Sequence, residues 1–178
     1  KHNLKLNFYN LSLLDKAPLE NLFKKYLIKK IIHFAGLKSV GESVMYPGKY
    51  FYNNVIGSKI FFNLAKKYKV DNLIFSSSAT VYGKPIYLPL NENHPIRSTN
   101  PYGQNKIDIE RLLINDPYFQ SECSVKVLRY FNPIGAHSSG MFGEKPMGIP
   151  NNLMPYILKV GKGIYPVFFF YADDFSYH

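Results

Sequence analysis

Short apolar runs alternate with helix-like segments along most of this chain. Apolar and polar residues alternate over 4–11, which predicts a strand. Asp15 is a candidate N-cap, and apolar residues at helical spacing after it, including Leu19 and Phe23, predict a helix. The run 31–35 (Ile-Ile-His-Phe-Ala) is the kind of strand that is buried on both faces of a parallel sheet, with His33 as a packed strand residue.

The later part of the chain continues this alternation. Strands are predicted at 72–75, where a polar serine loop follows, and at 125–130. Gly, Ser and Pro are frequent from 131 to 149, which predicts a long loop. Helices are predicted from Pro47 to about Tyr68, from Pro101 to about Asn115 before Asp116-Pro117, and from Asn151 or Asn152 to about Lys159. The helix after Pro47 is predicted to bury Phe51, Val55, Phe61, Phe62, Ala65 and Tyr68.

This order of elements predicts an α/β fold built on a doubly wound parallel sheet. Such sheets bind their ligands beyond the carboxyl ends of the strands. Three polar or glycine-containing motifs follow predicted strands, at 35–36, 76–80 and 130–132. We therefore expect these three motifs to lie at one edge of the sheet.

A hydroxyl, a phenol and an ammonium are candidates for chemistry at this edge. Asn100-Pro101 is a typical helix start, and it places Tyr102 and Lys106 one turn apart on one helical face. A free tyrosine titrates near pH ~10, and an ammonium roughly 4–5 Å away supplies about the 4 kcal/mol that would move its pKa toward 7. Ser78 would orient a substrate hydroxyl. Tyr and Lys are common at this spacing, so the pair alone is weak evidence for catalysis. The serine run after the predicted strand strengthens that evidence modestly.

These motifs resemble those of the UDP-glucose 4-epimerases, which are extended short-chain dehydrogenases/reductases. The similar blocks are Ser-Ser-Ser-Ala-Thr-Val-Tyr-Gly at 76–83, Asn-Pro-Tyr-x-x-x-Lys at 100–106, and the segments 33–43, 128–133 and 148–156. Related sugar-nucleotide dehydratases usually have Asp-Glu in place of Ala79-Thr80, which favours an epimerase. The resemblance covers roughly 15–163 and implies a Rossmann-like sheet.

The resemblance implies an NAD-dependent interconversion of UDP-glucose and UDP-galactose, in which hydride leaves C4 and returns to the other face of a 4-keto sugar. It implies that Tyr102 is the acid/base, that Lys106 lowers its pKa and holds the nicotinamide ribose, and that Ser78 bonds the 4-hydroxyl. The implied NAD-binding residues are Phe34, Ala35, Gly36, Lys38, Asn53, Ser76, Lys106, Tyr130 and Phe131. The implied residues for the UDP-sugar substrate are Ser78, Thr80, Tyr102, Asn132, Asn151, Asn152 and Leu153.

The same resemblance divides the chain into a partial NAD-binding domain, 1–133, and a partial substrate-binding lobe, 134–178. Family members begin with Gly-x-x-Gly-x-x-Gly between a strand and a helix, a pattern that this sequence lacks. The chain thus resembles the middle of an epimerase, and we expect the isolated chain to bind NAD poorly and to have little activity. Full-length family members are expected to form homodimers.

Composition narrows the remaining possibilities. The net charge is +10, but the lysines are scattered and form no stripe with aromatic residues, so we expect no nucleic-acid partner. No run of 18 apolar residues predicts a membrane span, and no Cys/His cluster has the spacing of a metal site. Cys123 is the single cysteine, which excludes an internal disulfide and fits a reducing, cytoplasmic location.

Two alternatives stay open at this point. One is a related epimerase of the same superfamily that acts on another nucleotide sugar, such as a UDP-uronate. The other is a catalytically silent copy that acts as a binding module.

Overall fold

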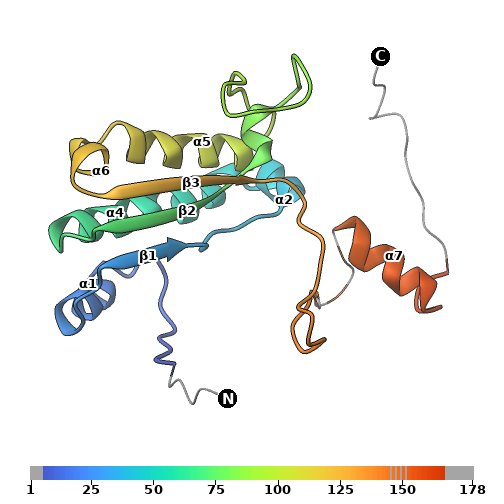
Figure 1. The fold of residues 1–178 in the computed structure, drawn as a ribbon, viewed down its shortest axis with the longest axis horizontal. Coiled ribbons are helices and arrows are strands. Elements are labelled where there is room, and N and C mark those ends of the chain that lie inside the picture. Colours follow the sequence, from blue (N-terminus) through green and yellow to red (C-terminus); the bar gives the residue numbers. More distant parts are fainter. Residues whose placement is uncertain (1–5, 145, 147, 149, 151, 167–178) are drawn as a thin grey trace. The chain divides into compact units, whose positions relative to one another are not determined.

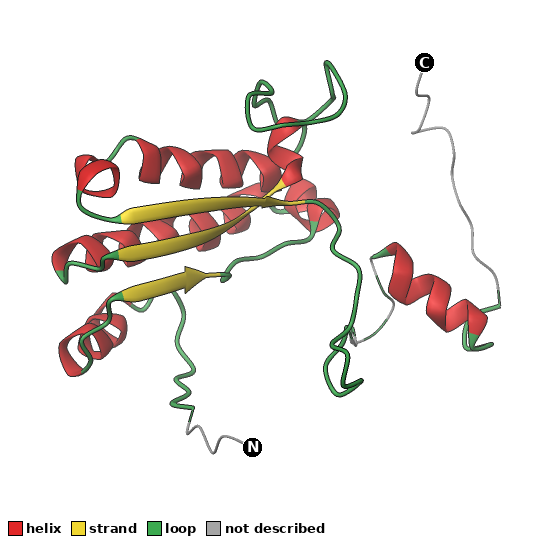
Figure 2. Cartoon of the chain, in the orientation of Figure 1, coloured by secondary structure: helices red, strands yellow, loops and turns green. Residues whose placement is uncertain are grey.

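The computed structural model describes residues 6–144, 146, 148, 150 and 152–166. The chain divides into two compact units, 1–131 and 132–178. The first unit holds a three-stranded parallel sheet in the order β1-β2-β3 (Figures 1 and 2). The strands are β1 (Lys30–His33), β2 (Asn72–Ser78) and β3 (Ser124–Tyr130). Its α-helices are α1 (Lys16–Lys25), α2 (Val40–Met45), α3 (Pro47–Tyr50), α4 (Gly57–Lys67), α5 (Pro101–Ile114) and α6 (Pro117–Ser121).

Two further helical turns join these elements. A π-helix, Phe51–Ile56, connects α3 to α4, and a 3₁₀ turn, Ala79–Tyr82, follows β2. The sequence predicted β3 and the starts of α1, α3 and α5, including the N-cap positions Asp15 and Asn100, and the structure confirms them. The parallel α/β class is confirmed as well.

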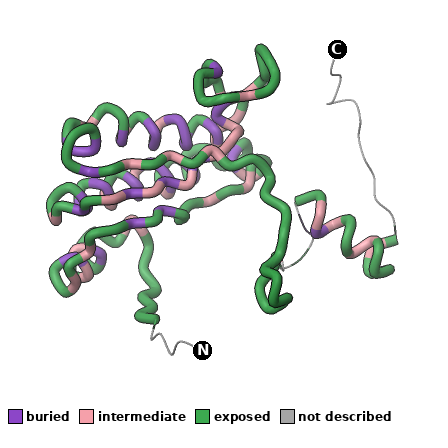
Figure 3. The backbone as a smooth tube through the Cα atoms, viewed as in Figure 1, coloured by how far each residue is buried: buried purple, intermediate pink, exposed green. Residues whose placement is uncertain are grey.

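The hydrophobic core of the first unit lies between the sheet and its helices. Leu73 and Phe75 of β2 are buried against a cluster that includes Phe62 of α4 and Ile109 of α5. Figure 3 shows the buried positions on the strands and on the helix faces turned toward them. This packing anchors the two helices that flank β2 and so fixes the start of α5 near the end of that strand.

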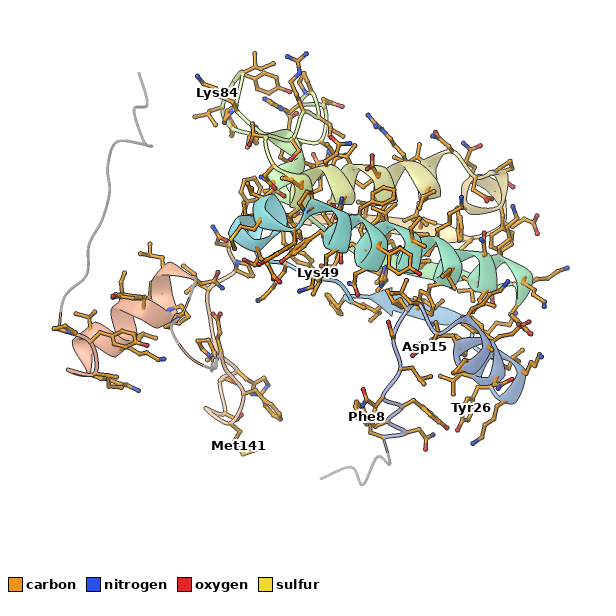
Figure 4. All side chains as sticks on the ribbon, turned by 180° about the vertical axis from the view of Figure 1, so that it is seen from behind. Phe8, Asp15, Tyr26, Lys49, Lys84 and Met141 are labelled. Carbon is orange, nitrogen blue, oxygen red and sulfur yellow. The ribbon has the colours of Figure 1, made fainter. Side chains whose placement is uncertain are left out.

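The prediction that 31–35 is buried on both faces is wrong. Burial alternates along β1, and Ile32 is 60% exposed. Seen from behind, the helices stand in front of the strands (Figure 4), and β2 and β3 also alternate between a more and a less buried side. Within the described part of the first unit, the helices therefore cover one face of the sheet. The apolar strand β1 is buried on that face only.

The strand predicted at 4–11 is not formed by its described residues, 6–11. Leu6 and Phe8 are 85% and 81% exposed, and Phe8 lies on a segment outside the sheet (Figure 4). An alternating pattern makes a strand only where a neighbouring strand supplies hydrogen bonds and a core covers the apolar face. These side chains have no such cover, so the pattern alone was not sufficient.

The helical face predicted after Pro47 also needs a correction. Val55, Phe62 and Ala65 are buried, but Phe51 is 46% exposed. A π turn holds one residue more than an α turn and rotates the following positions around the helix axis. Tyr50 and Asn54 are buried instead of Phe51.

Smaller differences concern where elements end. The serines 76–78, expected to form a loop, belong to β2, because they pair with β3 up to Ser78↔Tyr130. Pro117 begins the short helix α6 after α5 has ended at Ile114.

The second unit contains the helix α7 (Leu153–Gly161). Asn152 is its N-cap residue, so the predicted start is confirmed, although its side-chain oxygen accepts no capping hydrogen bond from the helix and its Nδ2 donates to Glu144 Oε1 at 3.0 Å. No helix in the described residues is long and apolar enough to cross a membrane. Among the same residues, no three His, Cys, Asp or Glu side chains gather as a metal site would require.

Candidate functional site

The motifs that follow the three strands meet at one edge of the first unit. The strands are parallel, and their register pairs His33 with Phe75 and Ser78 with Tyr130. The segments after them therefore leave the sheet at the same end. This is the edge at which the sequence placed the candidate chemistry.

Helix α5 begins at this edge because Asn100 caps it. The Asn100 side chain accepts a hydrogen bond from the Gly103 amide at 2.8 Å, and Pro101 occupies the first helical position. A Cβ on Gly103 would lie 2.9 Å from the carbonyl oxygen of Thr80. Only glycine therefore lets α5 approach the turn after β2 this closely, and this approach brings Tyr102 to the serines.

Ser78 connects that turn to the phenol. Its Oγ accepts hydrogen bonds from the amide of Thr80 at 3.2 Å and from the Thr80 hydroxyl at 3.0 Å. The Ser78 hydroxyl is then free to donate to the Tyr102 oxygen, and this bond favours the phenolate. Burial has the larger effect, so the pKa of Tyr102 is raised above its ordinary value.

Lys106 lies one turn further along α5 and is only 6% exposed. Its Nζ donates to the carbonyl oxygen of Ser76 at 2.7 Å and lies 5.6 Å from the centre of the Tyr102 ring. Burial lowers the pKa of Lys106 to about 8, and the Glu110 carboxylate opposes this effect. The structure thus brings Ser78, Tyr102 and Lys106 together.

The expected lowering of the Tyr102 pKa by Lys106 is not found, because burial raises this pKa and the opposing effect comes from Ser78. Both side chains are partly or largely removed from water, which favours the neutral phenol and the neutral amine. The ammonium is directed at the Ser76 carbonyl, and the Ser78 hydroxyl makes the hydrogen bond that favours the phenolate. The trio is present, with the Tyr102 phenol neutral and the Lys106 amine, whose pKa is lowered to about 8, still mostly protonated at neutral pH.

The residues after β1 form an exposed turn that could receive a planar ligand. Phe34, Ala35, Gly36 and Lys38 are all exposed. Gly36 has φ +151°, and a Cβ there would lie 3.2 Å from Asn54 Oδ1. A side chain at this position would be strained and would also press on Asn54, so the turn is kept open by glycine.

Asn54 holds this turn in place. Its Oδ1 accepts a hydrogen bond from the Leu37 amide at 2.8 Å, and its Nδ2 donates to the Leu37 carbonyl at 2.9 Å. The predicted cofactor residue, Asn53, is half-buried and donates to Asn54 Oδ1 at 2.9 Å. Asn54 was missed because an α-helical register gives it no special place, whereas the π-helix turns it inward. The signal available in the sequence was an asparagine next to the apolar residues that the helix was predicted to bury.

The remaining predicted residues fall into two groups. Tyr130 and Phe131 are exposed at the end of β3, and Thr80 is half-buried in the turn after β2. Asn132, Asn152 and Leu153 are exposed and belong to the second unit. Asn151 lies outside the described residues. The roles of all these side chains in binding stay predictions.

Comparison with known proteins gives a consistent result. A family model described as the NAD dependent epimerase/dehydratase family matches residues 1–169. The UDP-glucose 4-epimerase of Bacillus subtilis is 51% identical over 158 residues, which are 89% of this chain and 47% of that protein. The chain spans about half the length of the curated relatives it matches.

Solved structures show the same similarity. A UDP-glucose 4-epimerase from Stenotrophomonas maltophila, with bound NAD and formylated UDP-arabinopyranose, has a TM-score of 0.82 and 40% identity over 88% of this chain and 46% of its own. The UDP-glucose 4-epimerase from Brucella ovis in complex with NAD has a TM-score of 0.85 and 36% identity, and the match covers 96% of this chain and 52% of that one. The predicted Rossmann-like sheet is thus the fold shared with these enzymes.

Proposed function

Since this chain belongs to the NAD dependent epimerase/dehydratase family, we propose that it contributes the catalytic edge of an enzyme that interconverts UDP-glucose and UDP-galactose. The observation that carries the proposal is the convergence of three side chains. The Ser78 hydroxyl acts on the phenol of Tyr102 in the direction that favours the phenolate, and the Lys106 Nζ lies 5.6 Å from the centre of the same ring. A sugar hydroxyl placed beside Ser78 would meet both an orienting hydroxyl and an acid/base.

Several residues fit the nicotinamide end of NAD. The turn at Gly36 has no side chain and is braced by Asn54, so a flat group can approach its backbone. Lys106 supplies a cation at the edge, and Tyr130 and Phe131 offer exposed aromatic faces. We infer that these residues hold the nicotinamide and its ribose.

Each side chain then has one task. Tyr102 would take the proton of the sugar 4-hydroxyl at its phenolic oxygen and give it back after the sugar has turned over. Ser78 would hold the same hydroxyl by a hydrogen bond. Lys106 would bind the nicotinamide ribose and stabilise the phenolate. When bound, oxidised NAD would accept hydride from C4 and return it to the other face, and its positive ring would favour the phenolate of Tyr102.

The protonation state of Tyr102 would depend on whether NAD is bound. With the residues of this chain alone, burial outweighs the effect of Ser78 and keeps the phenol neutral. A cationic ring beside it would reverse that balance only in the loaded site. Tyr102 would thus become a base when a substrate is present to be oxidised.

The relatives suggest the rest of the assignment. The second unit would hold the nucleotide of the UDP-sugar through Asn132, Asn151, Asn152 and Leu153. We expect the full-length protein to be cytoplasmic, in agreement with the free, buried Cys123. We also expect a homodimer, supported by exposed apolar side chains along 44–52. Sedimentation at the mass of a single chain would contradict the dimer.

The test is an epimerase assay of the full-length protein that contains this chain. We expect conversion of UDP-galactose to UDP-glucose, and Tyr102→Phe should lower kcat by roughly 10²–10⁴-fold. Tyr87→Phe is the matched control, because Tyr87 is exposed and its hydroxyl binds Asn91 in a loop. Equal activity of Tyr102→Phe and wild type, or conversion of UDP-galacturonate in place of UDP-galactose, would contradict the proposal.

A further inference from the structure

A buried polar network that the proposed function does not use lies beside the catalytic trio. Its centre is Glu110, which is 2% exposed and stands one turn after Lys106 on α5. Arg129 of β3 donates from Nη2 to Glu110 Oε2 at 2.8 Å and from Nε to Oε1 at 3.1 Å. The Ser77 hydroxyl also donates to Oε1.

This carboxylate ties α5 to two strands at once. Ser77 and Arg129 are register partners across β2 and β3, and both reach Glu110. Arg129 also donates to the Tyr82 hydroxyl at 3.3 Å, with its guanidinium 5.1 Å from the centre of that ring. The turn after β2 is therefore attached to the same network.

Each of the three serines of β2 interacts with a residue from one of three successive turns of α5. The Ser78 hydroxyl acts on the Tyr102 phenol, the Ser76 carbonyl accepts a hydrogen bond from Lys106, and the Ser77 hydroxyl donates one to Glu110. A displacement of α5 along β2 would break all three contacts together. Of the three residues on α5, Glu110 is the one that also forms a two-pronged ion pair, with Arg129 of the neighbouring strand β3, and this is the strongest kind of hydrogen-bonded pair.

We propose that Glu110 is a positioning residue, which with Arg129 and Ser77 fixes α5 on β2 and β3 and so holds Lys106 beside Tyr102. The role in catalysis rests on the proposed function. Glu110 also acts on the charge of Lys106, because its carboxylate is the one that affects the pKa of this lysine. The other titratable neighbours of Lys106 are His33 and Tyr102. Burial lowers the pKa of Lys106, and the Glu110 carboxylate raises it again.

The experiment measures the titration of Lys106 in the 178-residue chain by ¹³C NMR of labelled lysine side chains, with Lys106→Arg to assign the signal. Glu110→Gln keeps the shape of the side chain and removes its charge. It should lower the pKa of Lys106 by about one pH unit. Glu110→Asp, which keeps the charge, should return the pKa toward the wild-type value.

Asp108→Asn is the matched control. Asp108 lies on α5 as well, but it faces Arg111 and Gln104, so its loss should leave the Lys106 titration nearly unchanged. The measurement needs neither NAD nor a sugar. Its outcome therefore does not depend on whether the proposed reaction is correct.

Glu110→Gln leaves Arg129 unpaired and could prevent folding, so a second variant is included. Glu110→Met with Arg129→Met removes both charges, and such replacements of a buried pair are often neutral for stability. We expect this variant to keep its circular dichroism spectrum and to show a lowered Lys106 pKa. An unchanged pKa in a folded variant would overturn the proposal. Loss of folding in the double variant would also overturn it, because the network would then be required for folding and not for positioning.

Discussion

Burial shifts the pKa values of several side chains at and near this site. His33 is 2% exposed, and its ring lies against Phe61, Phe62 and Phe75. Its Nε2 is 2.9 Å from the Ser58 hydroxyl. Burial, with a smaller effect of the Lys106 charge, lowers the pKa of His33 to about 4. The sequence predicted a packed strand residue here, and the structure confirms it.

This histidine should make stability depend on pH. An unfolded chain binds the proton near pH ~6.5 and the folded chain only near 4, so the unfolded state binds more protons between these values. Stability is then complete above about pH 6.5 and falls as the pH approaches 4, by roughly 3 kcal/mol. Denaturant unfolding at several pH values should show a smaller loss for His33→Gln.

The control for that measurement is His137→Gln, which alters an exposed histidine and should follow the wild type. A pH profile of His33→Gln that coincides with the wild type would show that His33 is not a neutral core residue.

Residue-level chemistry was predictable only in part. The identities of Ser78, Tyr102 and Lys106 were readable, because a strand end and a capped helix start fix where they point. Their protonation was not, because it depends on burial that pattern alone does not give. Asn54 and Glu110 were missed for the same reason, since each is functional only through partners distant in sequence.

At the scale of elements, the close contact of α5 with the turn after β2 controls the site. Gly103 lies between Tyr102 and Lys106, and its added Cβ would press on the Thr80 carbonyl and the Ser98 side chain. A backbone atom cannot move as freely as a side-chain end, so α5 would have to shift. The contacts of Tyr102 and Lys106 with the serines would loosen together.

Gly103→Ala should therefore destabilise the fold by about 1–3 kcal/mol in spite of the higher helix propensity of alanine. Gly41→Ala in α2 is the comparison, because nothing lies within 4 Å of its added Cβ. That change should be neutral or stabilising. Thermal unfolding of the two variants decides the point, and equal melting temperatures would contradict the packing argument.

Element types followed from the sequence better than their details did. Capped helices and apolar strands have local signals, so α1, α5 and β3 were predicted close to their observed bounds. The π-helix has no such signal, because one extra residue in a turn is tolerated only by its surroundings. Residues 6–11 show the opposite failure, in which a good local pattern has no partner strand.

At the scale of the whole molecule, the parallel α/β sheet followed from the alternation of strands and helices. The exposure of one face of the sheet could not be predicted in this way, because the burial of a sheet face depends on which other elements pack against it. The net charge of +10 fits a phosphate-bearing substrate. The assignment of NAD binding to 1–133 and of substrate binding to 134–178 stays a prediction.

The central claim is that hydride leaves C4 of the sugar and returns to it while Tyr102 handles the hydroxyl proton. The most direct test gives the full-length protein UDP-galactose deuterated at C4, in ordinary water, and follows the product by mass spectrometry. We predict UDP-glucose that retains the deuterium at C4, formed roughly 10²–10⁴-fold more slowly by Tyr102→Phe. UDP-glucose that has lost its deuterium to the solvent would contradict the account.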